Sequence, residues 1–312
     1  MINQLKALSG ILFLVILAYG GIWYTIAFQA EKDVTKRLSV WRDSGIRVEH
    51  GSIEHGGFPY RITVTIKNLS VATRSRGLSL EAKHIELISH VWTPRHWLAD
   101  ASGLTVSVAG DSTILSSTTH LASYRNHDDG KSIIAFESGA STGFALTRFM
   151  GQPASTPESW KFFLRSSGGE AEQQSGLYAK RFLDFKLETE AGPKSLSVMG
   201  GISGPHISDW TKPQLKNWSY EGGLLELDNF VLRSTNSFLK GNGSLTLDEQ
   251  FRPLGSASLT VQDGKDMTRI LSMWGLPTNM PLPARGPISL TLQNGAASME
   301  GTPLFSLKSI IQ

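Results

Sequence analysis

Residues 7–30 read ALSGILFLVILAYGGIWYTIAFQA, and this stretch decides the architecture because it holds no charged side chain and no histidine. Its apolar run from Leu8 to Phe28 matches the roughly 20 helical residues that cross a bilayer core. A backbone in lipid must satisfy its hydrogen bonds internally, so a spanning segment must be helical. An amphipathic helix of a soluble core has a polar face, and this stretch has none. We therefore predict an N-terminal transmembrane anchor over residues 1–30.

The charges around this stretch bear on its orientation. Lys6 is the one charged side chain before it, whereas Lys32, Lys36 and Arg37 follow it. Basic residues favour the cytoplasmic side, so the three that follow the stretch argue that the rest of the chain stays in the cytoplasm. A short, weakly basic start before an apolar run, however, is also the form of a secretory signal. We predict that the N-terminus stays inside and the rest of the chain is translocated.

A cleaved signal peptide is the alternative to a retained anchor. Ala18-Tyr19-Gly20 places small residues at the two positions that a signal peptidase reads. The apolar run continues past this point through Ile26, however, and that continuation favours an uncleaved anchor.

Composition limits the remaining possibilities. A chain of 312 residues leaves one large or two medium domains after the anchor. It has no cysteine, which excludes disulfides, thiolate metal sites and cysteine nucleophiles. Lysine and arginine number 30 against 27 acidic residues, so no broad basic field for nucleic acid is present. The 31 glycines indicate many turns and short strands.

The segment directly after the anchor continues as an amphipathic helix over residues 31–44. Val34, Leu38 and Trp41 recur at helical spacing, with charged residues between them. We expect this stripe to pack on the sheet that follows, and Gly45 to end the helix.

The spacing of the apolar residues then changes from a helical period to every second residue. Ile62, Val64 and Ile66 alternate with polar residues, as in a half-buried strand. The alternation changes parity near Lys83–His84, which predicts a β-bulge or a strand break there. Thr93-Pro94 is expected to start a short helical turn.

The rest of the chain repeats strand and turn, which implies an antiparallel sheet whose alternation reflects one covered face. Further strands are predicted over 133–136, 160–165, 182–190, 225–231, 245–247, 257–261 and 288–292, and helical patterns over 206–218 and 266–274. The predicted fold is mainly β (α+β), with a transmembrane helix followed by a large antiparallel, curved β-sheet and a few packed helices. The body spans residues 31–312, and its halves are expected at about 31–150 and 177–312.

A curved one-layer sheet can leave an apolar trough that marks a lipid or partner site. The candidate groove is lined by strand residues that point to one face: Ile62, Val64, Ile66, Leu104, Val106, Leu225, Leu227, Leu245, Leu247 and Leu290. The turn Phe58-Pro59-Tyr60 has two interpretations. Its aromatic rings either stand at the rim of a groove or at the membrane, or Pro59 fixes the turn while Phe58 caps the core.

Several of these motifs resemble one known family. The anchor, a helix holding Trp41, and Gly57-Phe58-Pro59-Tyr60-Arg61 before an alternating strand resemble the start of DUF2125, an uncharacterised bacterial family. The stretch Gly243-Ser-Leu-Thr-Leu-Asp248, followed by Arg252-Pro253-Leu254-Gly255, is similar too. That family looks distantly like the AsmA-type envelope proteins, which are linked to lipid movement. The resemblance implies a bacterial inner membrane protein with one span and its bulk in the periplasm, and it carries over no catalytic residue.

The histidines of the sequence form no metal-binding motif. The eight histidines form no His-Glu-x-x-His or His-x-His pair, and no thiolate can complete a zinc site. We expect no enzyme activity, no catalytic or metal-binding residue and no cofactor. The favoured function is to bind or move lipid or another amphiphile in the cell envelope. The alternatives are an assembly scaffold that contacts other envelope proteins and, further off, a periplasmic hydrolase.

Overall fold

The computed structural model describes residues 2–72, 78–108, 111–117, 120–128, 130–142, 158–167, 181–207, 212–265 and 283–309. The chain forms two compact units, Met1–Arg125 and Asn126–Gln312, which we call unit 1 and unit 2. In each unit the prediction of a mainly β, antiparallel and curved sheet is confirmed, as is the long apolar helix at the N-terminus. The helical pattern predicted over 266–274 lies outside the described residues.

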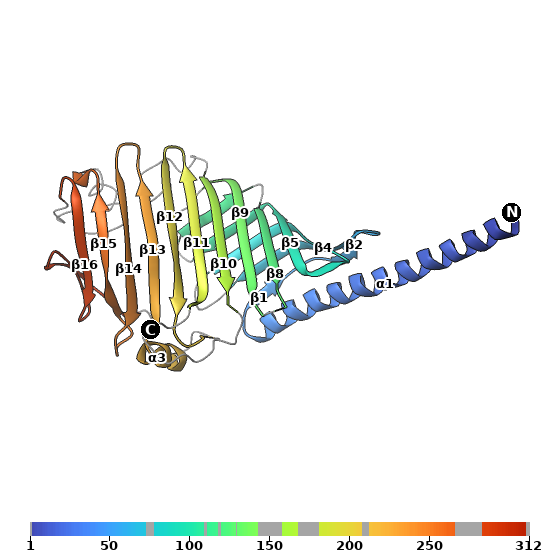
Figure 1. Ribbon diagram of the computed structural model, residues 1–312, viewed down its shortest axis with the longest axis horizontal. Coiled ribbons are helices and arrows are strands. Elements are labelled where there is room, and N and C mark those ends of the chain that lie inside the picture. The colour runs from blue at the N-terminus through green and yellow to red at the C-terminus, as the bar shows by residue number, and fades with distance from the viewer. Residues whose placement is uncertain are drawn as a thin grey trace. The chain divides into compact units, whose positions relative to one another are not determined.

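Helix α1 (Ile2–Asp43) is one uninterrupted helix of 42 residues (Figure 1), so the predicted anchor and the predicted helix over 31–44 are a single element. It is long and apolar enough to cross a membrane. Gly45 follows it with a φ of 89°, and the Ile46 amide donates to the Trp41 carbonyl at 3.1 Å. A left-handed residue that returns an amide to the last turn is a common helix ending, and glycine adopts it without strain.

Eight strands follow in unit 1, the last ending one residue beyond its boundary. They are β1 (Arg47–Glu49), β2 (Ile53–Gly56), β3 (Arg61–Ala72), β4 (Leu78–His90), β5 (Thr93–Ser102), β6 (Leu104–Val108), β7 (Asp111–Ser117) and β8 (His120–Asn126). β3 pairs with β1, β2 and β4, and β4 pairs in turn with β5 and β6. β5 also pairs with β8, and β6 with β7.

The parity change predicted near Lys83–His84 is real, but its cause is neither a bulge nor a break. β3 and β4 keep one register from Arg61↔His90 to Ala72↔Ser79. Instead, Asn68 takes a φ of 49° on β3, opposite Lys83. Beyond this position β4 exchanges its partner β5 for β6. Both strands therefore turn together, and their apolar side chains stay on the face that α1 covers.

A second difference from the sequence-based prediction lies in β5. The sequence predicts a helical turn that starts at Thr93-Pro94, yet β5 is extended from Thr93 to Ser102. Its backbone pairs with β4 on one side and β8 on the other, and these long-range ladders override the local preference.

Unit 2 is an antiparallel meander in which each described strand pairs with the next along the chain. Its strands are β9 (Ser132–Thr142), β10 (Glu158–Ser166), β11 (Arg181–Ala191), β12 (Lys194–Ser203), β13 (Leu224–Arg233), β14 (Phe238–Leu247), β15 (Pro253–Val261), β16 (Gly286–Gln293), β17 (Ala296–Met299) and β18 (Thr302–Ser306). Strands β10 to β16 stand side by side in Figure 1. The strands predicted over 133–136, 160–165 and 182–190 are β9, β10 and β11.

Helix α3 (Lys212–Tyr220) covers one end of the unit 2 sheet through Leu215 and Trp218. The indole Nε1 of Trp218 donates to the Ser203 carbonyl at 2.8 Å. Gly223 lies against this ring, where a Cβ atom would stand 2.3 Å from the indole carbons. Within the described residues, α3 therefore forms in the later part of the pattern predicted over 206–218, and Gly222 and Gly223 follow its end.

Candidate functional site

An apolar groove lies in unit 1 between the C-terminal half of α1 and the face of the sheet. Its volume is about 600 Å³, within the range of about 300–1,000 Å³ of small-molecule pockets. Eleven of its twelve lining residues are apolar. They are Val34, Leu38 and Trp41 from α1, Ile66, Leu69 and Val71 from β3, Leu80, Ile85 and Leu87 from β4, Ala99 from β5 and Ala122 from β8, and the twelfth residue is Arg37.

The helical wall of this groove is the stripe that the sequence predicted. Leu38 is 4% exposed and packs on Ile66 and Leu69 in one core cluster. Trp41 stays 45% exposed at the groove although it lies on the same stripe. Leu38 therefore closes the contact between helix and sheet, while Trp41 leaves part of the groove open.

The floor of the groove comes from cross-strand pairs of β3 and β4. Ile66 stands opposite Ile85, and Val71 stands opposite Leu80. Ile85 and Leu80 are only partly buried. A sheet face whose large side chains are incompletely covered still has apolar area to bury, which makes it a candidate surface for a ligand.

Arg37 is the one charged side chain among the described residues that line the groove. It is exposed, and it makes no ion pair with another described residue. A guanidinium presents five donors in a planar fork that matches a carboxylate or a phosphate. An apolar groove with one cation therefore has the chemistry to take an amphiphile with an anionic head.

The residues predicted for the groove lie in different places. In unit 1, Ile62 and Val64 are fully buried, Leu104 belongs to another core cluster, and Ile66 lines the apolar groove. Val106 packs beside Leu104. In unit 2, Leu227 and Leu247 line two further pockets, and Leu225 and Leu245 face each other across β13 and β14. Leu290 is paired with Ala257 and Met299.

Sequence reasoning missed most of the groove lining, although it identified the helix stripe. Leu69, Val71, Leu80, Ile85 and Leu87 alternate along β3 and β4 and were readable as strand residues. The missing signal was which of them lie beneath the helix, and that depends on the corner at Asn68. Arg37 could have been found from its place next to Leu38 on the amphipathic helix.

The turn predicted at the rim lies elsewhere, next to the apolar part of α1. The Phe58–Pro59 bond is cis. Phe58 is 55% exposed, and its ring meets Trp23 edge-on at a centroid distance of 5.3 Å. Tyr60 is 65% exposed. None of the three turn residues lines the apolar groove.

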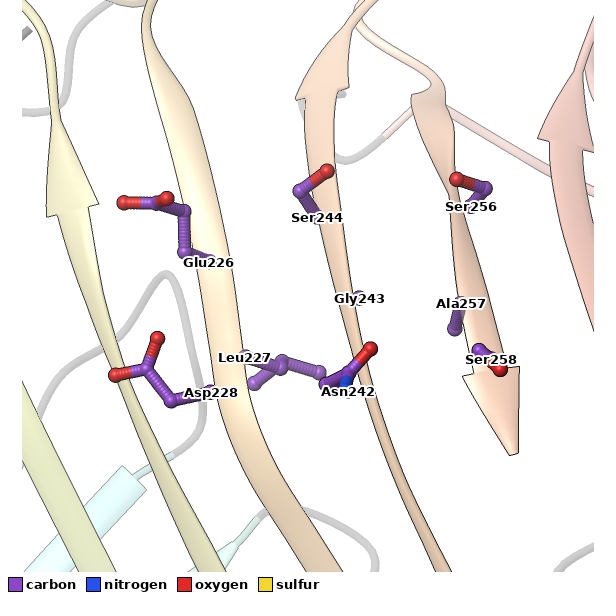
Figure 2. Close-up of a pocket in the computed structure, with 9 residues that line it drawn as sticks. All are labelled: Glu226, Leu227, Asp228, Asn242, Gly243, Ser244, Ser256, Ala257 and Ser258. Atoms are coloured by element: carbon purple, nitrogen blue, oxygen red, sulfur yellow. The ribbon is translucent and has the colours of Figure 1, made fainter. Parts of the chain in front are cut away.

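A second, polar groove of about 490 Å³ crosses β13, β14 and β15 in unit 2 (Figure 2). Glu226 and Asp228 stand on one side and serine hydroxyls on the other, and no histidine is among its lining residues. Gly243 lies in its floor. A Cβ atom at this position would stand 2.6 Å from the Ser256 carbonyl oxygen, so the position has no room for a side chain.

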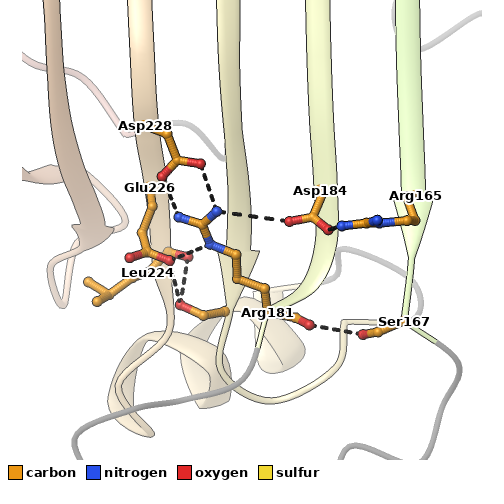
Figure 3. A network of polar contacts seen from close by, with 8 residues as sticks. Arg165, Ser167, Arg181, Asp184, Leu224, Glu226 and Asp228 are labelled. Atoms are coloured by element: carbon orange, nitrogen blue, oxygen red, sulfur yellow. Dashed lines mark hydrogen bonds and ion pairs between the residues drawn. The ribbon is translucent and has the colours of Figure 1, made fainter.

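The acids of the polar groove are already engaged by Arg181 on β11 (Figure 3). Its Nε donates to Glu226 at 2.9 Å, and its Nη1 donates to Asp228 at 2.7 Å. Arg181 also lies 3.9 Å from Asp184, which pairs with Arg165 at 2.8 Å. These hydrogen bonds raise the pKa of Arg181 and lower the pKa of Asp228.

This network explains Gly201, which lies near the C-terminal end of β12. Arg181 must cross β12 to reach the acids on β13, and a Cβ atom at Gly201 would stand 2.6 Å from its Cδ. Two guanidinium groups thus join three carboxylates across the sheet. The network is suited to holding strands together, because few of its donors and acceptors remain for a ligand.

Among the described residues, no group of three or more histidine, aspartate or glutamate side chains is placed to hold a metal ion. His55 contacts Glu31 on α1, and His96 contacts Ser123 at 3.0 Å. These two histidines therefore connect neighbouring elements: His55 joins β2 to α1, and His96 joins β5 to β8.

The fold and the site together define a β-rich protein whose N-terminal apolar helix is compatible with a membrane anchor. The family model described as "Uncharacterized protein conserved in bacteria (DUF2125)" matches residues 23–299, so the chain belongs to the DUF2125 family. The resemblance to DUF2125 stated from the sequence is thereby confirmed, whereas the likeness to AsmA-type proteins stays a prediction. Comparisons with curated proteins and with solved structures gave no match.

Proposed function

We propose that this protein is held in the bacterial inner membrane by α1 and binds one acyl chain of a lipid in the apolar groove of unit 1, outside the cytoplasm and without catalysis. The observation that carries the proposal is the groove itself, which holds about 600 Å³ between an amphipathic helix and an incompletely covered sheet face. Apolar area left unburied in a folded protein favours a ligand that removes it from water.

The chemical class of the ligand follows from the lining. Alkyl and indole groups surround the groove, so its occupant must be apolar along its length. Arg37 lies on the same helix face as Leu38 and Trp41, where its guanidinium can meet a carboxylate or a phosphate. The groove therefore suits a fatty acid or an anionic phospholipid better than a neutral hydrocarbon.

Photo-crosslinking of the full chain in lipid nanodiscs tests this function. A diazirine-bearing palmitate and a diazirine-bearing phosphatidylglycerol serve as probes, and labelled peptides are identified by mass spectrometry. The apolar helix residues 8–28 contact lipid in any case and provide the internal reference. We expect additional labels on α1 residues 34–41 and on β3 and β4.

Neighbouring residues of β5 provide matched variants. Ala99 lines the groove, whereas Leu98 points to the other sheet face and is exposed. Ala99→Phe fills the groove and is expected to abolish groove labelling, while Leu98→Phe leaves it unchanged. Arg37→Gln is expected to reduce labelling by the anionic probes. The proposal is overturned if the groove of the natural chain is not labelled. It is also overturned if Ala99→Phe and Leu98→Phe are labelled equally.

The orientation has its own test, because the chain has no cysteine. Val40 is exposed on α1 beyond the apolar run. A single cysteine placed there reacts with a membrane-impermeant maleimide in cells with a permeabilised outer membrane if the body is outside the cytoplasm. Reaction only after the inner membrane is lysed refutes this orientation.

A further inference from the structure

Two turns of unit 1 lie against α1 inside its apolar run. The first is the β2–β3 turn at residues 57–60, and the second joins β4 to β5 at residues 91–92. The indole Nε1 of Trp23 donates to the Arg61 carbonyl at 2.7 Å, and the Tyr19 hydroxyl donates to the Pro59 carbonyl. Specific bonds therefore hold the first turn at the level of helix residues 19–23.

Further packing makes this contact a firm one. Ile62 and Ala27 are both 0% exposed and belong to one core cluster with Trp23. The pairing of Arg61 with His90 places the second turn beside the first. The level of both turns along α1 is thus set by the fold of unit 1.

The length of α1 then decides where the turns stand in a membrane. The apolar run from Leu8 to Phe28 is about 31 Å long at 1.5 Å per residue, close to the roughly 30 Å of a hydrocarbon core. Tyr19 and Trp23 lie about 8–14 Å before its end by the same rise. A bilayer that stopped short of the turns would cover only Leu8 to Ala18, about 16 Å of helix. This is about half of what spanning requires.

The side chains that the turns expose fit a place in the membrane. Phe58, Tyr60 and Trp92 are 55%, 65% and 63% exposed. Tyr60 and Trp92 lie together, with ring centroids 6.5 Å apart. Tyrosine and tryptophan rings, which combine an apolar body with one polar group, concentrate where a bilayer meets water. The exposed Arg61 can reach the headgroups with its long side chain.

We propose that Phe58, Tyr60 and Trp92 form an aromatic tip that inserts into the same bilayer that α1 spans, in the leaflet farther from the N-terminus. The inference rests on the anchoring stated under the proposed function, but it does not depend on lipid in the groove. It makes unit 1 a body partly embedded in the membrane surface, in contrast to a body held away from it on a stalk.

Single labelled cysteines measure the depth of the tip, because the natural chain has none to compete. Tyr60→Cys, Val40→Cys and Leu12→Cys are each modified with an environment-sensitive fluorophore and reconstituted as full chains in phosphatidylcholine–phosphatidylglycerol vesicles. All three positions are exposed in the protein, so labelling leaves the core intact. Leu12 reports the apolar run, and Val40 lies about 18 Å beyond Phe28 along the helix.

Quenching by iodide in water and by spin-labelled lipid distinguishes the outcomes. We expect the Tyr60 label to resemble the Leu12 label, with iodide quenching several-fold weaker than at Val40 and strong quenching by lipid. A Tyr60 label that behaves like the Val40 label, while the Leu12 label stays protected, overturns the insertion of the tip and leaves anchoring intact. A Leu12 label open to iodide overturns both.

Discussion

The junction between α1 and the sheet allows the most direct energetic test of the structure. Ile62 on β3 is 0% exposed and packs with Trp23 and Ala27 of the helix. Ile62→Ala removes three buried carbons, which at about 0.8 kcal/mol each is about 2.4 kcal/mol of lost transfer free energy. The cavity left behind adds to this cost, and the measured range for such changes is about 2–5 kcal/mol.

The assay is urea unfolding of the full chain in nanodiscs, followed by far-UV circular dichroism of the β-sheet. Ile62→Val removes one carbon and is expected to cost about 0.5–1.5 kcal/mol, which gives a graded series. Leu98→Ala, at an exposed position of β5, is the control and is expected to stay within about 0.5 kcal/mol of the natural chain. If Ile62→Ala costs no more than Leu98→Ala, β3 does not pack on α1 as described.

Three further changes probe other contacts. Gly223→Ala places a Cβ atom 2.3 Å from the Trp218 ring and is expected to lower the free energy of unfolding by about 1–3 kcal/mol, measured by urea unfolding. Trp23→Phe removes the hydrogen bond to the backbone and is expected to cost about 0.5–1.5 kcal/mol in the same assay. Arg181→Met is expected to cost about 0.2–1 kcal/mol near neutral pH, since the ion pair is partly exposed. The hydrogen bond from Arg181 holds the pKa of Asp228 below its usual value, so this contribution is complete above the unfolded pKa of about 3.9 and is lost as pH falls through the folded pKa. The difference between Arg181→Met and the natural chain must therefore shrink in acid, and a difference that grows there contradicts the assignment.

Local pattern predicted the elements of this fold better than their partners. The alternation of Ile62, Val64 and Ile66 predicts a strand because period two is a property of consecutive residues. The extended form of Thr93 to Ser102 could not be predicted in the same way, because it depends on pairing with β4 and β8. β8 begins only at His120, and nothing near Thr93 encodes that partner.

The candidate site also has a part that local pattern predicts and a part that depends on long-range contacts. The stripe of Val34, Leu38 and Trp41 predicts one wall of the apolar groove from helical spacing alone. The opposite wall needs the corner at Asn68, whose left-handed φ is set by the folded sheet. A sequence-based list of inward strand residues therefore mixes filled core positions such as Ile62 with groove positions such as Ile66.

The unbroken course of α1 would couple the height of the groove to the membrane under the proposed anchoring. Val34 to Trp41 lie about 9–20 Å beyond Phe28 along one helix, by a rise of 1.5 Å per residue. No hinge in α1 separates this segment from the apolar run, so a tilt of the anchor tilts the groove by the same angle. Under the proposed function, the thickness of the surrounding bilayer thus sets how far an acyl chain must rise from its leaflet to enter.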